Sequence, residues 1–176
     1  TGVKGGAVVN ALTTEQISQS LDLLIRYQRV SLRDLAEFRE GVEGNVASLA
    51  VERAVPEDIE WLKSLLQKAG DHLKKGSSGW EDFIATDNEI HIHLAQIAGN
   101  PIYLSVFRTI YSSIHKYFDK FLPRREELLH ENYRDLCEIV EAVEKKQASR
   151  VHLLVQTHVY RFNRIMEENA RQDERI

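Results

Sequence analysis

Apolar residues recur every three or four positions along most of this 176-residue chain, and no other feature constrains its fold more strongly. This spacing places apolar side chains on one face of a helix, and charged residues fill the opposite faces. Only three prolines occur, and Pro56 and Pro101 stand where a helical pattern begins. The chain is therefore predicted to be all-α, an antiparallel bundle of six to seven helices around one core.

The helical pattern divides into seven segments. Their predicted ranges are about 13–26, 31–53, 56–75, 79–98, 101–122, 125–145 and 147–170. Residues 1–10 differ, because three glycines and a β-branched run indicate a turn and a short strand. We expect residues 11–176 to form one helical domain and residues 1–10 to be the tail of something upstream.

Composition excludes several classes of protein. The formal net charge of −4 argues against a chain that grips nucleic acid by itself. No run of about 18 uncharged apolar residues is present, so no transmembrane helix is expected. The N-terminus lacks the basic, apolar and small-residue pattern of a signal peptide. The single cysteine, Cys137, fits a reducing compartment.

One apolar stripe is interrupted by an acid and a base. On a helix, Phe83, Asp87, Ile90, His91 and Leu94 share a face, so Asp87 and His91 lie one turn apart and point inward. A carboxylate that faces a core is costly unless it is paired or binds a metal. The pair therefore predicts either a buried ion pair or two ligands of a site.

Other inward stripes carry polar residues as well. His158 lies at the centre of the last stripe, Arg39 interrupts the second, and Asn132 lies one turn before Leu136 in the sixth. In a helical bundle, polar side chains on facing helices build the binding sites. His93, by contrast, lies about 200° around the helix axis from His91 and is expected to face solvent.

Asp87, His91 and His158 are candidates for one shared site. Two histidines and a carboxylate are a common ligand set for Zn, Ni, Mn or Fe, with positions left open for water or an anion. The alternative is that both histidines are hydrogen-bonded core residues and that Asp87 pairs with one of them. Arg39 either pairs with Glu43 one turn later or holds an anionic ligand, and the pattern favours neither.

The segment from Asp87 to Asn100 reads Asp-x-x-x-His-x-x-Leu-Ala-x-x-x-Gly-Asn. This motif closely resembles the hallmark of the effector-binding (FCD-type) domain of FadR-subfamily regulators in the GntR family. Residues 34–50 look like the opening helix of that domain, and residues 141–158 look like its closing helix pair. Residues 5–9 look like the end of the wing of a winged helix. The resemblance spans about residues 17 to 166.

The resemblance implies a cytoplasmic, homodimeric transcription regulator whose N-terminal winged helix-turn-helix domain, absent from this chain, binds DNA. It also implies a divalent metal such as Zn, Ni or Mn, held by one aspartate and three histidines. Asp87, His91 and His158 match three of these ligands, but Leu136 stands where the remaining histidine is expected. We expect Leu136 to weaken or abolish metal binding.

The first hypothesis is therefore a ligand-sensing domain rather than an enzyme, with no catalytic residues. A small carboxylate effector is expected to be anchored by Arg39, with Asn100 and Arg108 as further contacts and with apolar neighbours such as Tyr111. Three states of the trio remain open: a weak metal site completed by water or effector, a metal-free effector site, or a buried hydrogen-bonded cluster. The alternative classes are a metal-dependent hydrolase-like enzyme and a helical interaction domain without a ligand.

Overall fold

The computed structural model describes residues 14–27 and 30–173, and the predicted wing remnant and linker at residues 1–10 lie outside these ranges. Within them the chain forms seven α-helices, one short 3₁₀ helix (η1) and no strand. The helices are α1 (Thr14–Tyr27), α2 (Leu32–Arg53), α3 (Pro56–Leu73), η1 (Gly76–Gly79), α4 (Trp80–Ile97), α5 (Pro101–Phe121), α6 (Glu126–Glu144) and α7 (Ala148–Asp173). The predicted all-α class is confirmed.

Local sequence signals set the helix ends. Ser31 caps α2 by accepting a hydrogen bond from the Asp34 amide, and the Asp34 carboxylate accepts one from the Ser31 amide in return. Pro56 and Pro101 occupy the first positions of α3 and α5, as predicted. After α4 the backbone turns at Gly99, whose φ of +66° is a conformation that favours glycine.

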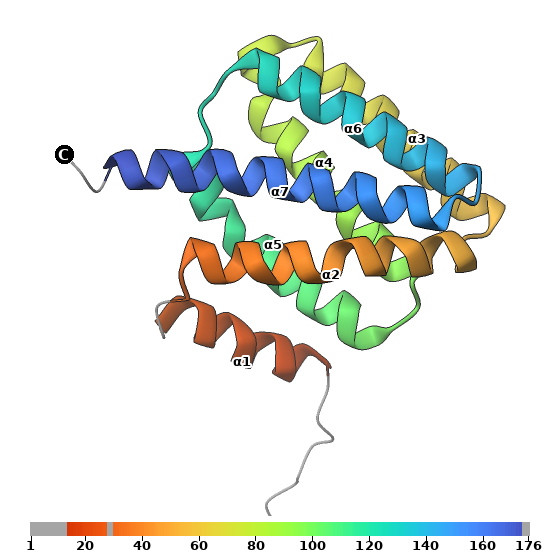
Figure 1. The fold of residues 1–176 in the computed structure, drawn as a ribbon, viewed down its shortest axis with the longest axis horizontal. Helices are drawn as coiled ribbons and strands as arrows, with labels where there is room; N and C mark the ends of the chain where they lie inside the picture. The colour runs from red at the N-terminus through yellow and green to blue at the C-terminus, as the bar shows by residue number, and fades with distance from the viewer. Residues whose placement is uncertain (1–13, 28–29, 174–176) are drawn as a thin grey trace, which may run out of the picture.

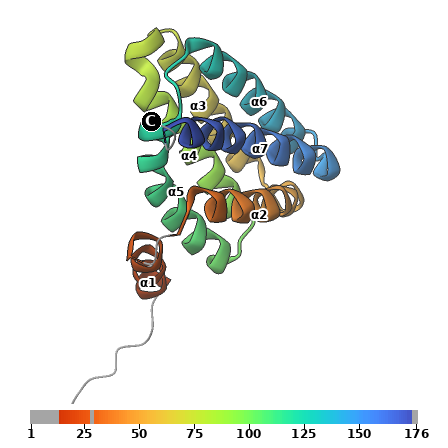
Figure 2. The same ribbon diagram turned by 60° about the vertical axis from the view of Figure 1, so that its left-hand side comes forward.

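The helices pack as a bundle in which α2 and α7 lie side by side along the length of the molecule (Figure 1). α3 and α6 pack together beside them, and α4 runs through the middle, in contact with α2, α3, α5 and α6. α1 lies at the edge of the bundle and packs on α5, as the second view also shows (Figure 2). No helix in the described part of the chain is long and apolar enough to cross a membrane.

The core is apolar except around α4. Fully buried apolar residues come from every helix from α2 to α7, among them Leu35, Leu62, Phe83, Ile114 and Leu136. The polar side chains buried with them are Arg39, Glu43, Thr86, Asp87, Asn88, His91, Ser105, Thr109, Ser113, Asn132, His158 and Asn163. Buried polar groups need partners, and most of the charged ones meet where α2, α4, α5 and α7 converge.

Candidate metal centre

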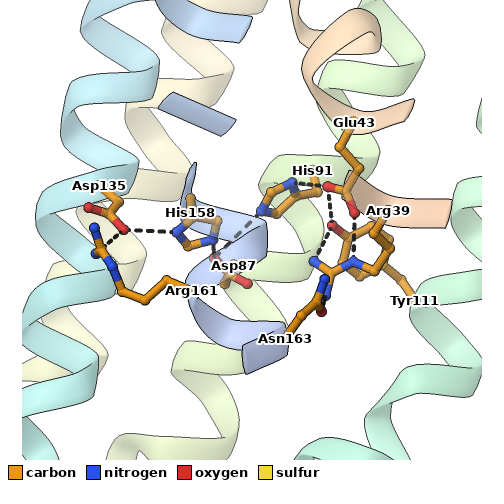
Figure 3. A network of polar contacts seen from close by, with 9 residues as sticks. All are labelled: Arg39, Glu43, Asp87, His91, Tyr111, Asp135, His158, Arg161 and Asn163. Carbon is orange, nitrogen blue, oxygen red and sulfur yellow. Dashed lines mark hydrogen bonds and ion pairs between the residues drawn. The ribbon is translucent and has the colours of Figure 1, made fainter. Parts of the chain in front are cut away.

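Helix packing brings the three predicted ligands together. Asp87 and His91 lie one turn apart on α4, and α7 places His158 against them (Figure 3). One ligand atom from each of the three lies within 4.8 Å of the others. The two imidazole rings stack with their centroids 5.3 Å apart, and all three side chains are buried. The fold therefore brings the three predicted ligands together.

A carboxylate on α2 sets the orientation of His91. Its Nδ1 lies 2.7 Å from Glu43 Oε2, and both side chains are 2% exposed. An imidazole that donates from Nδ1 to a carboxylate has its lone pair on Nε2. That Nε2 is buried and makes no hydrogen bond to any described residue. The ring therefore presents to the interior of the bundle a nitrogen whose lone pair is unused and could bind a metal.

His158 is oriented in the same way from the other side. Its Nδ1 lies 3.2 Å from Asp135 Oδ2 on α6, and the same oxygen accepts a 2.7 Å contact from Arg161 Nη1. His158 Nε2 then faces Asp87 Oδ1 at 3.5 Å. Both histidines thus direct Nε2 inward and hold a carboxylate behind Nδ1, the arrangement that recurs around metal-binding histidines.

The spacing of the three donor atoms fits a metal ion. Asp87 Oδ1 lies 3.5 Å from His158 Nε2 and 3.9 Å from His91 Nε2, too far for strong hydrogen bonds, and it is buried without a hydrogen-bond partner in the described ranges. Ligand atoms of a tetrahedral zinc site lie about 3.3 Å apart, given bonds of about 2 Å. A small contraction around an ion therefore satisfies the orphaned atoms.

Without a metal, the buried carboxylates and His158 are charged. Burial raises the pKa of Asp87, but the nearby His158 and His91 outweigh burial and keep this pKa below its usual value. Burial also raises the pKa of Glu43, which Arg39 and His91 lower to about 2. Burial lowers the pKa of His158, but Asp135 and Asp87 raise it to about 9. The buried carboxylates are therefore ionised, which is the form that binds metals, whereas His158 must release a proton when a metal binds.

A second cluster lies on the other side of His91. Arg39 Nε donates to Glu43 Oε1 at 2.6 Å, Arg39 Nη2 to Tyr111 at 3.1 Å, and the Tyr111 hydroxyl to Glu43 Oε2 at 2.7 Å. Arg39 Nη1 reaches Asn163 Oδ1 at 3.4 Å. The predicted Arg39–Glu43 ion pair is present, and Glu43 links this cluster to His91. Whether Arg39 also holds an anionic ligand stays a prediction.

The remaining predicted residues lie elsewhere. Leu136 is fully buried in α6, and Asn132, one turn earlier, is buried with Oδ1 unpartnered in the described ranges. Asn100 caps α5 by accepting from the Ile102 amide at 2.9 Å, and Arg108 is exposed. Neither Asn100 nor Arg108 joins the buried network, so the structure does not support the predicted grouping of these two with Arg39.

Three residues of the network were not predicted from the sequence, and one further side chain was misplaced. Asp135, Arg161 and Asn163 were not predicted to belong to it, and no spacing rule connects Asp135 on α6 with His158 on α7. A polar residue next to the unusual Leu136 was the only available signal. His93 was predicted to face solvent, but its side chain is 12% exposed and packs at a ring distance of 5.9 Å from Trp61.

Known proteins match the chain over most of its length. The sequence pattern of the FCD domain matches residues 34–161. The chain belongs to the FCD domain family. This confirms the resemblance inferred from the motif at residues 87–100 and agrees with the all-helical fold.

One curated relative of this FCD domain is the HTH-type transcriptional repressor NanR of Cronobacter sakazakii (strain ATCC BAA-894). It is 29% identical over 125 residues, which make up 70% of this chain and 46% of NanR. The chain thus spans less than half the length of that repressor.

Two solved structures share the fold. Streptococcus agalactiae GntR superposes with a TM-score of 0.68 at 23% identity, covering 84% of this chain and 65% of that one. E. coli McbR/YncC superposes with a TM-score of 0.69 at 17% identity, covering 78% of this chain and 68% of that one. At these identities the two structures support the helical architecture only.

Proposed function

We propose that this FCD domain is the ligand-sensing domain of a cytoplasmic, homodimeric transcription regulator of the FadR subfamily. In this proposal it binds a small carboxylate effector, and binding changes the DNA affinity of a winged helix-turn-helix domain elsewhere in the protein. The buried trio of Asp87, His91 and His158 carries the proposal, since orphaned donor atoms in a core call for a ligand. The relative NanR, named a transcriptional repressor, supports the regulatory role.

Asp87, His91 and His158 would hold one divalent metal, Zn, Ni or Mn. The metal would supply a fixed positive charge that attracts an acidic effector. Glu43 and Asp135 hold the two rings so that each Nε2 points at the site. Leu136 offers no donor atom in place of a fourth protein ligand, so water or the effector itself would complete the coordination shell.

Arg39 is proposed as the second anchor for the effector. Its guanidinium is buried and is bound by Glu43, Tyr111 and Asn163. An effector carboxylate would have to replace at least one of these partners, so its binding would rearrange contacts among α2, α5 and α7. A ligand that prefers one of two arrangements shifts the population toward it.

A hydrolase-like enzyme built on the same trio is the alternative. The named function of NanR favours a regulator. Hydrolysis of a small ester that stops when a chelator is added would instead favour the enzyme.

Thermal melts of chelator-treated protein test the metal site. Zn, Ni or Mn at about 100 times its dissociation constant should add about 2.7 kcal/mol of stability, which is roughly 5–11 °C for a domain of this size. His158→Ala and the isosteric Asp87→Asn should lose this rise. His130→Ala, an exposed histidine change on α6, should keep it.

No rise at millimolar metal, or a rise that survives Asp87→Asn, would refute the metal site. Carboxylate binding to the metal-free protein, abolished in an Arg39→Lys variant, would then still support the sensing role without metal.

A further inference from the structure

A surface cleft lies on the far side of His158. It has a volume of about 430 Å³ between α6 and α7, and His158 forms part of its wall. Figure 3 shows Asp135 and Arg161 on this side of the His158 ring, and His91 on the other. The cleft and the buried trio therefore share one side chain. A volume of this size is in the range of small-molecule sites, about 300–1,000 Å³.

One stripe of α7 forms the long wall of the cleft. Arg150, Leu154, Thr157 and Arg161 follow one another at steps of four, three and four residues, so they share a face of the helix. The two arginines lie about 16 Å apart along the axis, with an apolar residue and a hydroxyl between them. Leu153, which is 61% exposed, widens the apolar part.

Neither arginine makes a bidentate contact with its acidic neighbour. Arg161 contacts Asp135 through Nη1 at 2.7 Å, and Arg150 Nη2 lies 3.8 Å from Glu138, beyond hydrogen-bond distance. A guanidinium carries five N–H donors in a planar fork that matches a carboxylate. Arg161 can therefore bind a second carboxylate while it keeps Asp135.

The acidic groups of the cleft do not prevent this. Asp135 is only 20% exposed and already accepts from His158 and Arg161, which balance its negative charge. Glu138 lies on α6 near the opposite arginine. An incoming carboxylate at Arg161 thus meets N–H donors first, and an apolar tail attached to it would lie along Leu154 and Leu153.

We infer that the α6–α7 cleft is a second ligand site of this domain, for a small carboxylate with a short apolar tail, coupled to the buried trio through the Asp135–His158 contact. Binding in the cleft is independent of the metal, whereas the coupling rests on the metal site proposed above. A carboxylate on Arg161 shares its positive charge, which leaves Asp135 a stronger acceptor for His158 Nδ1 and so makes Nε2 of the neutral His158 ring a better metal donor.

The binding test uses hexanoate as the probe and chelator-treated protein, followed by backbone amide shifts in NMR. Hexanoate should shift amides of residues 149–161, whereas hexanol and hexylamine should not. Arg161→Gln should weaken hexanoate binding about tenfold or more, because a hydrogen bond to a charged group is lost. Thr157→Tyr, at an exposed position, should block the cleft without disturbing the core.

The control is Arg164→Gln on the same helix, outside the cleft, where Arg164 pairs with Glu168 at 3.2 Å. It should leave hexanoate binding unchanged. Shifts centred on α2 and α5, or binding that survives both Arg161→Gln and Thr157→Tyr, would overturn the cleft as the site.

The coupling test measures zinc affinity with a competing chelator. Hexanoate at saturation should tighten zinc binding severalfold, and zinc should tighten hexanoate binding by the same factor, because linkage is reciprocal. Asp135→Asn should abolish the coupling and leave hexanoate bound. Unchanged zinc affinity in the wild type would overturn the coupling, and zinc that fails to bind with hexanoate absent would refute the metal site instead.

Discussion

Glu43 is the residue whose neutralisation should damage the core most. Its carboxylate, 2% exposed, accepts from Arg39 Nε at 2.6 Å, from the Tyr111 hydroxyl at 2.7 Å and from His91 Nδ1 at 2.7 Å. Glu43→Gln keeps the shape of the side chain, but it replaces one acceptor oxygen with an NH₂ group and removes the negative charge. Arg39 is then left buried without its counter-charge.

The cost follows from burial. Removing one partner of a buried ion pair destabilises a protein by about 3–5 kcal/mol, because the other charge stays uncompensated in a low dielectric. The same helix provides a matched control. Arg33 and Glu37 form an ion pair at the same spacing and at 3.0 Å, but their side chains are 76% and 65% exposed. Glu37→Gln should cost less than about 1 kcal/mol.

Urea unfolding of the two variants and the wild type, all treated with chelator, measures the difference. For a domain of this size, 3–5 kcal/mol lowers Tm by roughly 6–20 °C, so thermal melts should agree. Equal losses in Glu43→Gln and Glu37→Gln would refute the argument, since the two pairs share a helix and a spacing but differ in burial and in the further partners that burial gives Glu43. A loss below about 1 kcal/mol in Glu43→Gln would show that Arg39 finds another partner or water.

Further outcomes follow from the same geometry. Without metal, the free energy of unfolding measured in urea should be greatest between pH 4.5 and 6.5. The stabilisation from ionised Glu43 is complete above its unfolded pKa of 4.5 and is lost as the pH falls toward its folded pKa of about 2. The contribution of His158 is complete below 6.5 and is lost as pH rises toward its folded pKa of about 9. Asp135→Asn should weaken zinc binding about 10–100-fold in chelator competition, since it removes the carboxylate behind the His158 ring. Gly44→Ala should destabilise the domain by about 1–3 kcal/mol in urea unfolding, because its Cβ would lie 2.9 Å from a backbone oxygen of α7. Gly41→Ala on the same helix meets no atom within 4 Å and should stabilise the domain by up to about 1 kcal/mol.

Much of the fold could be predicted because its signals are local. Helix ends marked by Ser31, Pro56 and Pro101 fall within one residue of their predicted places. The end of α3 was predicted two residues late, at 75 instead of Leu73. There the chain turns into η1 through Gly76, whose φ is +58°, and a helical stripe does not report such a turn.

The site was predictable only where a stripe carries the information. Asp87, His91 and His158 each interrupt an apolar stripe, and this identified them as inward-facing. Asp135 is half-buried at the edge of its stripe, so only the packing of α6 against α7 reveals its contact with His158. His93 was wrongly predicted to face solvent because α4 is surrounded by four other helices, which cover the polar face of α4 as well as its apolar face.

Helix α5 has contacts on two opposite sides. Tyr111 points into the buried network, while Ser113, two positions later and so about 200° around the helix, donates to Asp22 of α1 at 3.2 Å. α1 packs on α5, and a rigid helix cannot roll at one of these side chains without rolling at the other. A movement of α1 would therefore be transmitted through α5 to the charges around Arg39. α5 thus links α1 on one side to the Arg39–Glu43–Tyr111 cluster on the other.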